Sequence, residues 1–333
     1  MKKYYFSRTD RVGDFLMSSI LINAIKKNVS NSYIVVIASN KNFDYIKQLD
    51  FIDEVILYPE KNFIKKILLL KKILLDNIYS FVVLDGKKRS IYLSLFSGAK
   101  EKYLFTNKIF YQKLLRKFFS EIFLDSNKET KILEIKKLLS IKKIKFSNDY
   151  LNVLKNRVFK KEIKSKILIA DKNNILLHFD EKWIDGSYIN TYKNIEPDIE
   201  SFKIFTQKII DTSDQNLIIS TGNIDNKIIH DFKSTMKMIN NFYYKKDYKG
   251  KYIILFDNLS FLHLEYLVSE CNLIISCHGA VTHLASSWDK SVIDIIEYNK
   301  EGFYKKWSSH IREYKSLYRD DFEKLSTNII EKL

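Results

Sequence analysis

Short apolar runs alternate with helical patterns along most of this chain. Residues 4–7 and 33–38 are typical of strands, and the second run is apolar enough for a strand that is covered on both faces. Between them, Leu16, Ile20 and Ala24 recur at four-residue spacing, which predicts a helix. Further strands are expected at 54–58 and 81–85, and further helices at 63–75, 110–121 and 128–140. This alternation predicts a parallel, doubly wound α/β sheet.

The alternation starts again in the second half of the chain. Residues 141–172 are rich in lysine and asparagine and have weak strand signals, so we place a domain junction there. Strands are expected at 174–179, 216–220, 252–256, 273–276 and 292–296, and helices at 199–211, 261–270 and 281–288. We predict two Rossmann-like α/β domains facing a cleft, 1–155 and 165–305, with a helical segment, 306–333, that packs back across the junction.

Composition narrows the class of protein. The 333 residues suffice for two domains, and 46% hydrophobic with 29% charged residues is a globular composition. The longest apolar stretch, 63–75, is interrupted by four lysines, so a membrane-spanning helix is not expected. The basic start of the chain lacks an apolar signal core, which predicts a cytoplasmic protein. Cys271 and Cys277 are interpreted as buried, reduced thiols.

The formal net charge of +16 has two explanations. An AT-rich genome enriches lysine, isoleucine and asparagine in every protein, which would make the charge uninformative. Alternatively, a basic face rests on the anionic inner membrane or receives an acidic acceptor. A nucleic-acid-binding protein could also use this charge, but the basic residues are dispersed and no known module motif occurs.

The segment 273–297 is the most informative part of the sequence. A predicted strand ends at Ser276, small residues Gly279 and Ala280 form a turn, and a helix follows. In a parallel sheet this turn lies at the carboxyl edge, where the unpaired N–H groups of a helix start attract phosphate. His283 could add a donor from the same face. The alternative is an ordinary helix start, with His283 as a core histidine. A zinc site at His278 and His283 is disfavoured by their five-residue spacing.

This segment resembles the C-terminal signature of the heptosyltransferase-like glycosyltransferases, family 9, which have the GT-B fold. The resemblance covers the run from His278 to Ser287, the preceding helix 259–268 and the trailing residues 289–293. A second likeness lies near the N-terminus, where Arg11-Val12-Gly13-Asp14 resembles the family's Arg-Ile-Gly-Asp opening.

The resemblance implies an inverting transfer of a heptose or related sugar from a nucleotide-sugar. It implies that Asp14 is the catalytic base, although a helix-capping carboxylate would suit the same position. Arg8 and Arg11 either bind an acidic acceptor or form surface ion pairs. The implied donor-binding residues are Lys182, His278, Gly279, Ala280, Val281, Thr282 and His283. The family has an aspartate where this chain has His278, which puts the donor sugar in doubt.

Further expectations concern cofactors and partners. No Asp-x-Asp pair occurs, so a metal-bridged mechanism is disfavoured, and neither metal nor other cofactor is expected. The implied partners are a nucleotide-sugar donor and a glycolipid or oligosaccharide acceptor such as a lipopolysaccharide intermediate, without nucleic acid. An oxidoreductase is disfavoured because Gly-x-Gly-x-x-Gly is absent, and a P-loop is absent too. A non-catalytic, sugar-nucleotide-binding relative remains an alternative.

Overall fold

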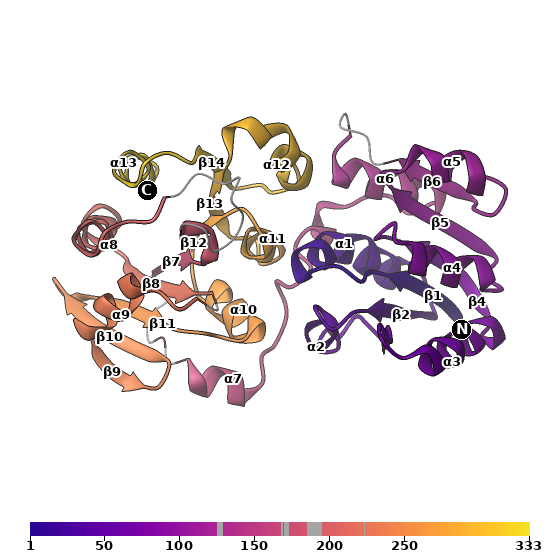
Figure 1. Ribbon diagram of the computed structural model, residues 1–333, viewed down its shortest axis with the longest axis horizontal. Coiled ribbons are helices and arrows are strands. Elements are labelled where there is room, and N and C mark those ends of the chain that lie inside the picture. Colours follow the sequence, from indigo (N-terminus) through magenta and orange to yellow (C-terminus); the bar gives the residue numbers. More distant parts are fainter. Residues whose placement is uncertain (125–128, 168, 170–172, 185–194, 223) are drawn as a thin grey trace. The chain divides into compact units, whose positions relative to one another are not determined.

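The computed structural model describes residues 1–124, 129–167, 169, 173–184, 195–222 and 224–333, which form two compact units (Figure 1). The N-terminal unit is Met1–Val153 and the C-terminal unit is Leu154–Leu333. The change from one unit to the other falls within the lysine-rich stretch 141–172. Both units are α/β, as the sequence predicts.

Within the described residues of the N-terminal unit, six parallel strands form a sheet in the order β3-β2-β1-β4-β5-β6. The strands are β1 (Lys2–Ser7), β2 (Ser32–Ala38), β3 (Glu54–Leu57), β4 (Ile78–Val83), β5 (Glu101–Thr106) and β6 (Glu121–Leu124). The helices are α1 (Val12–Asn28), α2 (Phe43–Ile46), α3 (Phe63–Leu75), α4 (Lys88–Phe96), α5 (Ile109–Leu115) and α6 (Lys131–Ile141), followed by the short η1 (Asn148–Tyr150). The sequence predicts α3 at its observed bounds but misses α4, β5 and β6.

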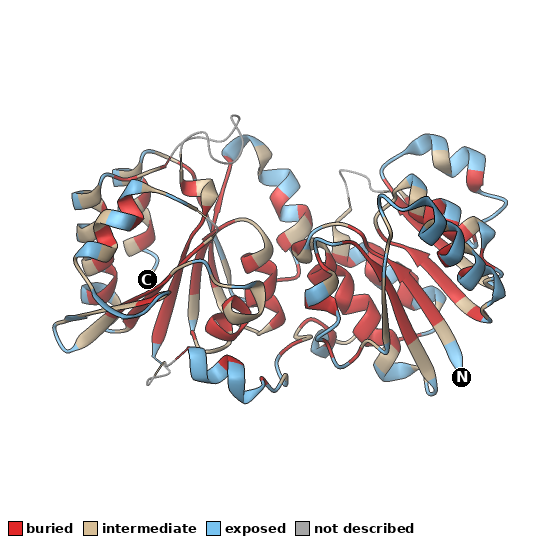
Figure 2. Cartoon of the chain, turned by 60° about the horizontal axis from the view of Figure 1, so that its bottom comes forward, coloured by how far each residue is buried: buried red, intermediate tan, exposed pale blue. Residues whose placement is uncertain are grey.

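Helices cover both faces of this sheet. On one face, α3, α4 and α5 share a core with the strands, to which they contribute Leu69, Ile91 and Leu115 among others. The crossover from β1 to β2 places α1 on the opposite face, where it contacts α6. Burial on both faces explains why the central strands are apolar in nearly every position (Figure 2).

Within the described part of the C-terminal unit, eight strands form a sheet in the order β14-β13-β12-β7-β8-β11-β10-β9. The strands are β7 (Asn174–Phe179), β8 (Asn216–Thr221), β9 (Lys237–Asn240), β10 (Tyr243–Tyr248), β11 (Lys251–Phe256), β12 (Leu273–Cys277), β13 (Ser291–Ile296) and β14 (Tyr314–Tyr318). The helices are α7 (Lys161–Lys166), η2 (Glu181–Trp183), α8 (Ile199–Ser213), α9 (Lys227–Ser234), α10 (Phe261–Ser269), α11 (Ala280–Ser287), η3 (Tyr298–Lys300), α12 (Glu301–Ser308) and α13 (Phe322–Ile330). The core of this unit includes the fully buried Trp183.

Two features of this sheet correct the sequence predictions. Strand β10 runs antiparallel to β11 and β9, so the sheet is not wholly parallel. The cause is the tight turn Lys249-Gly250, since both residues have positive φ, 48° and 76°, as a two-residue hairpin turn requires.

The prediction that residues 306–333 form a helical segment is wrong for Tyr314–Tyr318. These residues form β14, which pairs with the edge of β13 and satisfies its backbone groups. Helix α13 does follow, but it contacts α8 and β14 and buries Leu325 and Ile329 in the core of the C-terminal unit. The packing of this segment across the junction stays a prediction.

Candidate functional site

The N-terminal unit gathers polar residues where its strand order reverses. Strands β1 and β4 are neighbours there, and ligands of such sheets bind beyond the carboxyl ends of the strands at this place. Asp85, which follows β4, accepts hydrogen bonds from the Thr9 amide at 3.1 Å and the Thr9 hydroxyl at 2.6 Å. The Ser90 hydroxyl donates to the same carboxylate at 2.9 Å. Asp85 thus joins the loops after β1 and β4. Sequence reasoning missed this role, although the position directly after a buried strand was a signal.

Asp14 lies in the first turn of α1, beside this cluster. Its Oδ2 accepts a hydrogen bond from the Arg11 amide at 3.4 Å, and its Oδ1 lies 3.4 Å from Arg8 Nη2. The hydrogen bond from the Arg11 amide is the helix-capping arrangement. The contact with the Arg8 guanidinium orients the carboxylate. The side chain keeps 31% of its surface exposed, so a substrate hydroxyl can reach it. The geometry therefore accommodates both interpretations, and the catalytic role stays a prediction.

The two arginines predicted to bind an acceptor occupy different environments. Arg8 is buried, with 8% of its side chain exposed. Its guanidinium donates to the Leu84 carbonyl and lies near both Asp10, at 3.6 Å, and Asp14. Arg8 is thus placed to position Asp14 more than to meet an acceptor. Arg11 is exposed at the start of α1 and remains accessible.

In the C-terminal unit the strand order reverses between β7 and β12. Lys182 follows β7 and Gly279 follows β12, and the structure brings them together. A methyl group built on Gly279 would lie 2.9 Å from Lys182 Nζ. Lys182 also forms an ion pair with Asp180, a carboxylate that the sequence analysis did not single out. A cation therefore sits at the start of α11, where small residues leave the backbone open.

The ion pair of Lys182 and Asp180 is largely withdrawn from water. The exposed fractions of the two side chains are 13% and 4%. Burial alone would lower the pKa of Lys182, but the neighbouring Asp180 carboxylate outweighs this effect and raises it. Burial likewise opposes the ionised form of Asp180, yet Lys182 holds its pKa below the usual range. Both groups stay charged near neutral pH.

The first turn of α11 presents its backbone, because two of its side chains point inward. Val281 is 4% exposed and Thr282 is fully buried. The Thr282 hydroxyl accepts a hydrogen bond from the Gly279 amide at 3.2 Å and donates to Asp294 at 2.9 Å. Predicted ligand contacts of Val281 and Thr282 could therefore come only from their N–H groups. Ala280 is half-buried between them and Gly279.

His278 is held by a buried carboxylate. Its Nδ1 lies 2.6 Å from Asp294 Oδ2, and Asp294 is fully buried in β13. The Tyr314 hydroxyl donates to the same carboxylate oxygen at 2.8 Å. An imidazole that donates Nδ1–H to a carboxylate has a fixed orientation, which leaves Nε2 as the ring nitrogen available to a ligand. Sequence reasoning missed Asp294, whose signal was a lone carboxylate in an otherwise apolar strand.

His283 is packed in the interior of the unit. It is 6% exposed, and its ring stacks on His310 with 6.0 Å between centroids and 7° between planes. The ring centroid of Trp307 lies 6.2 Å from that of His283. The Nδ1 atom of His283 has no hydrogen-bond partner among the described residues. Burial lowers the pKa of His283 well below its ordinary value. This placement suits the core-histidine alternative better than a phosphate-binding cation.

Two other buried histidines predict a loss of stability in acid. Burial lowers the pKa of both His178 and His310 to about 4, compared with about 6.5 in the unfolded chain. The unfolded state therefore binds more protons between these values, so the free energy of unfolding should fall as pH drops from 7 to 4. His310→Gln should reduce this slope by on the order of 1 kcal/mol per pH unit in urea titrations. A slope in His310→Gln equal to that of the wild type contradicts the assignment.

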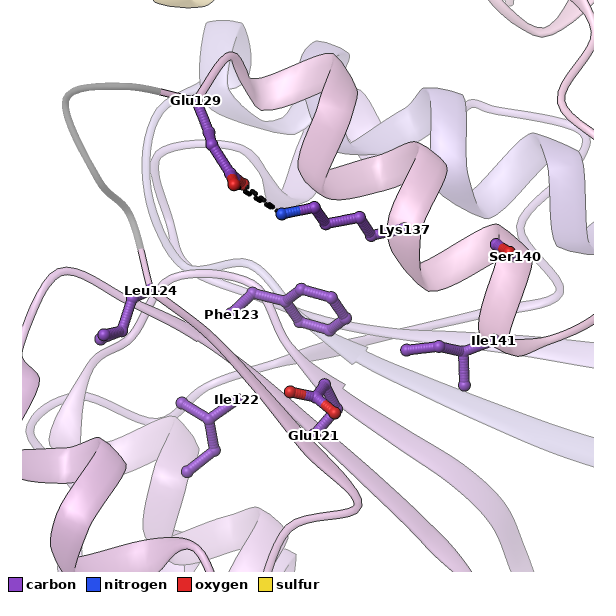
Figure 3. Close-up of a pocket in the computed structure, with 8 residues that line it drawn as sticks. All are labelled: Glu121, Ile122, Phe123, Leu124, Glu129, Lys137, Ser140 and Ile141. Carbon is purple, nitrogen blue, oxygen red and sulfur yellow. Dashed lines mark hydrogen bonds and ion pairs between the residues drawn. The ribbon is translucent and has the colours of Figure 1, made fainter.

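A cavity of about 520 Å³ lies elsewhere, between β6 and α6 of the N-terminal unit (Figure 3). Phe123 and Ile141 line it, and an ion pair between Glu129 and Lys137 spans one side at 2.6 Å. No predicted site residue reaches it.

The described residues contain no group of three His, Cys, Asp or Glu side chains that could hold a metal ion. Among them there is likewise no helix both long and apolar enough to cross a membrane.

The two units share one architecture. The N-terminal order β3-β2-β1-β4-β5-β6 and the C-terminal order β11-β8-β7-β12-β13-β14 are both the 3-2-1-4-5-6 order of nucleotide-binding Rossmann units. A chain built from two such units has the class of fold that the sequence predicts, GT-B.

Comparison with known proteins agrees with this class. No family model and no curated protein matches the sequence. Among solved structures, a family 9 glycosyl transferase from Veillonella parvula is similar with a TM-score of 0.69 and 15% identity, over 98% of this chain and 89% of that one. The E. coli heptosyltransferase WaaC with ADP is similar with a TM-score of 0.67 and 9% identity, over 99% of this chain and 98% of that one. A UDP-GlcNAc 2-epimerase from Methanocaldococcus jannaschii is similar with a TM-score of 0.56 and 15% identity, over 100% of this chain and 92% of that one. The predicted likeness to family 9 is thus confirmed for the fold.

Proposed function

We propose that this protein is an inverting, metal-independent glycosyltransferase that moves a heptose or related sugar from a nucleotide-sugar to a surface-glycan acceptor, such as a lipopolysaccharide intermediate. The observation that carries the proposal is the placement of Lys182 beside Gly279, at the reversal of strand order in the C-terminal unit. There, a cation and the N-terminus of α11 together suit a diphosphate. One of the similar solved structures is a heptosyltransferase with ADP, which fits this assignment.

In this mechanism each unit supplies a different group. The acceptor hydroxyl gives its proton to the Asp14 carboxylate, and its oxygen attacks the anomeric carbon as the bond from that carbon to the diphosphate breaks. Negative charge then develops on the departing nucleoside diphosphate. Lys182 and the N–H groups of α11 stabilise that charge. His278 takes the place of a family carboxylate near the sugar, with its orientation set by Asp294.

A second candidate is a nucleotide-sugar epimerase, because the 2-epimerase from Methanocaldococcus jannaschii shares the fold over the full chain. An epimerase would change the sugar of the donor without an acceptor, whereas a transferase requires one. The non-catalytic alternative would bind a nucleotide-sugar and change nothing. Incubation of the protein with the donor alone, followed by NMR analysis of the sugar, identifies an epimerase. Incubation with donor and acceptor together then separates a transferase from the non-catalytic alternative.

The test of the proposed function is a thermal-shift screen against ADP-, GDP-, UDP-, dTDP- and CMP-sugars, without added metal. Ligand at 100 times its Kd stabilises the folded state by about 2.7 kcal/mol, which produces a measurable rise in Tm. We expect one nucleotide class to raise Tm and the others to have little effect. No shift with any nucleotide would remove the basis for the donor site.

Gly279→Ala should weaken nucleotide binding with little effect on folding. The φ of Gly279 is 174°, which any residue adopts, so the backbone tolerates alanine. The added methyl would displace the flexible end of Lys182, 2.9 Å away, from the start of α11. We expect at least a tenfold rise in the Kd for the nucleoside diphosphate, measured by isothermal titration calorimetry. Gly302→Ala is the matched control, because nothing lies within 4 Å of its added carbon; equal affinities in both variants would disprove the contact.

A further inference from the structure

Helix α3 is apolar on its outer side as well as its inner side. Leu69 and Ile73 point into the core of the N-terminal unit. Six further apolar residues of the helix are exposed by 50% to 73%: Phe63, Ile64, Ile67, Leu68, Leu74 and Leu75. A helix that is apolar on both sides is normally buried on both sides. The outer side of α3 therefore calls for an apolar partner beyond the described residues.

The two helices beside α3 in the same layer continue this surface. Helices α4 and α5 rest on the same core as α3, and α3 contacts α4. Exposed apolar residues on and just after them are Tyr92, Phe96, Ile109, Phe110, Leu114 and Phe118. We name the outer surface of α3, α4, α5 and Phe118 the outer helical face.

The charge of the outer helical face has one sign. The three stretches that form and flank it, 61–75, 87–100 and 102–120, contain 14 lysines and arginines and no aspartate or glutamate. Ten of these cations are exposed: Lys61, Lys65, Lys71, Lys72, Lys88, Lys100, Lys108, Lys113, Arg116 and Lys117.

Four acidic residues at the border of this face are already paired. Asp76 lies 2.6 Å from Lys3 and Glu60 lies 3.0 Å from Arg89. Glu54 pairs with Lys72, and Glu101 with Lys142. These four acidic groups thus do little to offset the positive charge of the face.

We propose that the outer helical face docks on an anionic lipid bilayer. Exposed leucine, isoleucine and phenylalanine among lysines is the composition of helices that lie in a membrane interface, where apolar side chains enter the acyl boundary and lysines meet anionic headgroups. A second copy of the same basic face would be repelled by charge, and nucleic acid offers no partner for the aliphatic residues. The inference deepens the proposed function, because it places the enzyme where a lipid-linked acceptor resides.

Vesicle co-sedimentation of the full-length protein tests this inference. We expect binding to vesicles of 30% phosphatidylglycerol in phosphatidylcholine, and at least tenfold weaker binding to pure phosphatidylcholine. The variant Ile64→Ser/Leu68→Ser/Leu75→Ser removes exposed apolar groups, and Lys65→Glu/Lys71→Glu reverses exposed charge. Each should weaken binding to the anionic vesicles at least tenfold, while circular dichroism and Tm remain those of the wild type.

Matched controls lie in the C-terminal unit. Ile204→Ser/Met238→Ser/Tyr298→Ser alters equally exposed apolar residues, and Lys237→Glu/Lys305→Glu alters exposed lysines. Both should bind vesicles within twofold of the wild type. The proposal is overturned if the wild type does not sediment with anionic vesicles, if face and control variants bind alike, or if sedimentation equilibrium shows a dimer that the serine variant abolishes. Vesicle binding requires no nucleotide, so it stands or fails separately from the thermal-shift screen.

Discussion

Replacing Asp14 with asparagine should lower kcat for sugar transfer by about 10² to 10⁴, the usual contribution of a general base. Asparagine keeps the shape of the side chain and an oxygen that can accept from the Arg11 amide. It removes the negative charge and the ability to take a proton. Because 31% of the Asp14 side chain is exposed, we expect a stability loss of no more than about 1 kcal/mol. Nucleotide affinity, measured by calorimetry, should not change.

Asp10→Asn is the control for this experiment. Asp10 also pairs with Arg8, at 3.6 Å, and is exposed to a similar degree, 23% compared with 31%. The control variant loses the same kind of ion pair, so its kcat should stay within about tenfold of the wild type. If transfer survives largely intact in Asp14→Asn, the carboxylate only caps α1 and the base lies elsewhere.

Replacing Lys182 with methionine should cost about 3–5 kcal/mol in the free energy of unfolding, because it leaves Asp180 charged and buried without its partner. The double variant Lys182→Met/Asp180→Asn should recover most of that stability, since neither charge then remains. Nucleotide binding should be weakened at least a hundredfold in both variants. Urea denaturation gives the stability, and calorimetry gives the affinity.

The exposed pair Lys251–Asp214, 3.1 Å apart, is the control. Lys251→Met should cost less than about 1 kcal/mol, because Asp214 is 90% exposed and water replaces its partner. A double variant at Lys182 and Asp180 that binds nucleotide as tightly as the wild type would show that the lysine is only structural. If Lys182→Met alone does not lower the free energy of unfolding, the buried Asp180 carboxylate does not need Lys182 as its partner.

The two units have the same strand order but different chemistry at its point of reversal. In the N-terminal unit, Asp85 joins two loops, and Asp14 lies beside Arg8 with 31% of its side chain exposed. In the C-terminal unit, Lys182 and the start of α11 present positive charge and N–H groups. An acid–base step needs an accessible carboxylate, whereas a phosphate-binding step needs a cation and N–H groups.

Local patterns in the sequence predict much of the fold. The alternation of apolar runs and helices predicts two α/β halves, and the bounds of α3 follow from its helical periodicity. Parallel edge strands such as β14 escape this reasoning, because Tyr314–Tyr318 lies in a helical-looking tail and becomes a strand only by pairing with β13. The hairpin of β10 and β11 was missed although Lys249-Gly250 is a recognisable turn.

The candidate site was predictable where its residues are close in sequence. The turn from His278 to Val281 follows from a buried strand that runs into small residues. The contact of Lys182 with Gly279 joins positions almost a hundred residues apart, and only the order of the sheet brings them together. The same holds for Asp294, which the register of β12 and β13 places opposite Ser276, within reach of His278.

The environment of His283 could not be predicted from local sequence patterns. Helical spacing puts it one turn into α11 but does not say which side of the helix meets the interior. Its stacking partner His310 comes 27 positions later in the chain, after α12, so no local pattern reveals the pair. The outer helical face is a similar case, because periodicity predicts α3 without indicating that both of its sides are apolar surfaces in need of a partner.

We propose that the C-terminal unit binds a nucleoside diphosphate between Lys182 and the start of α11. Amide hydrogen–deuterium exchange, with and without the nucleotide selected by the thermal-shift screen, tests it most directly. We expect slower exchange in the peptides that contain residues 180–184 and 278–283, and no change around Asp14. Protection around Asp14 instead, or bound nucleotide without protection at either of the first two peptides, would contradict it.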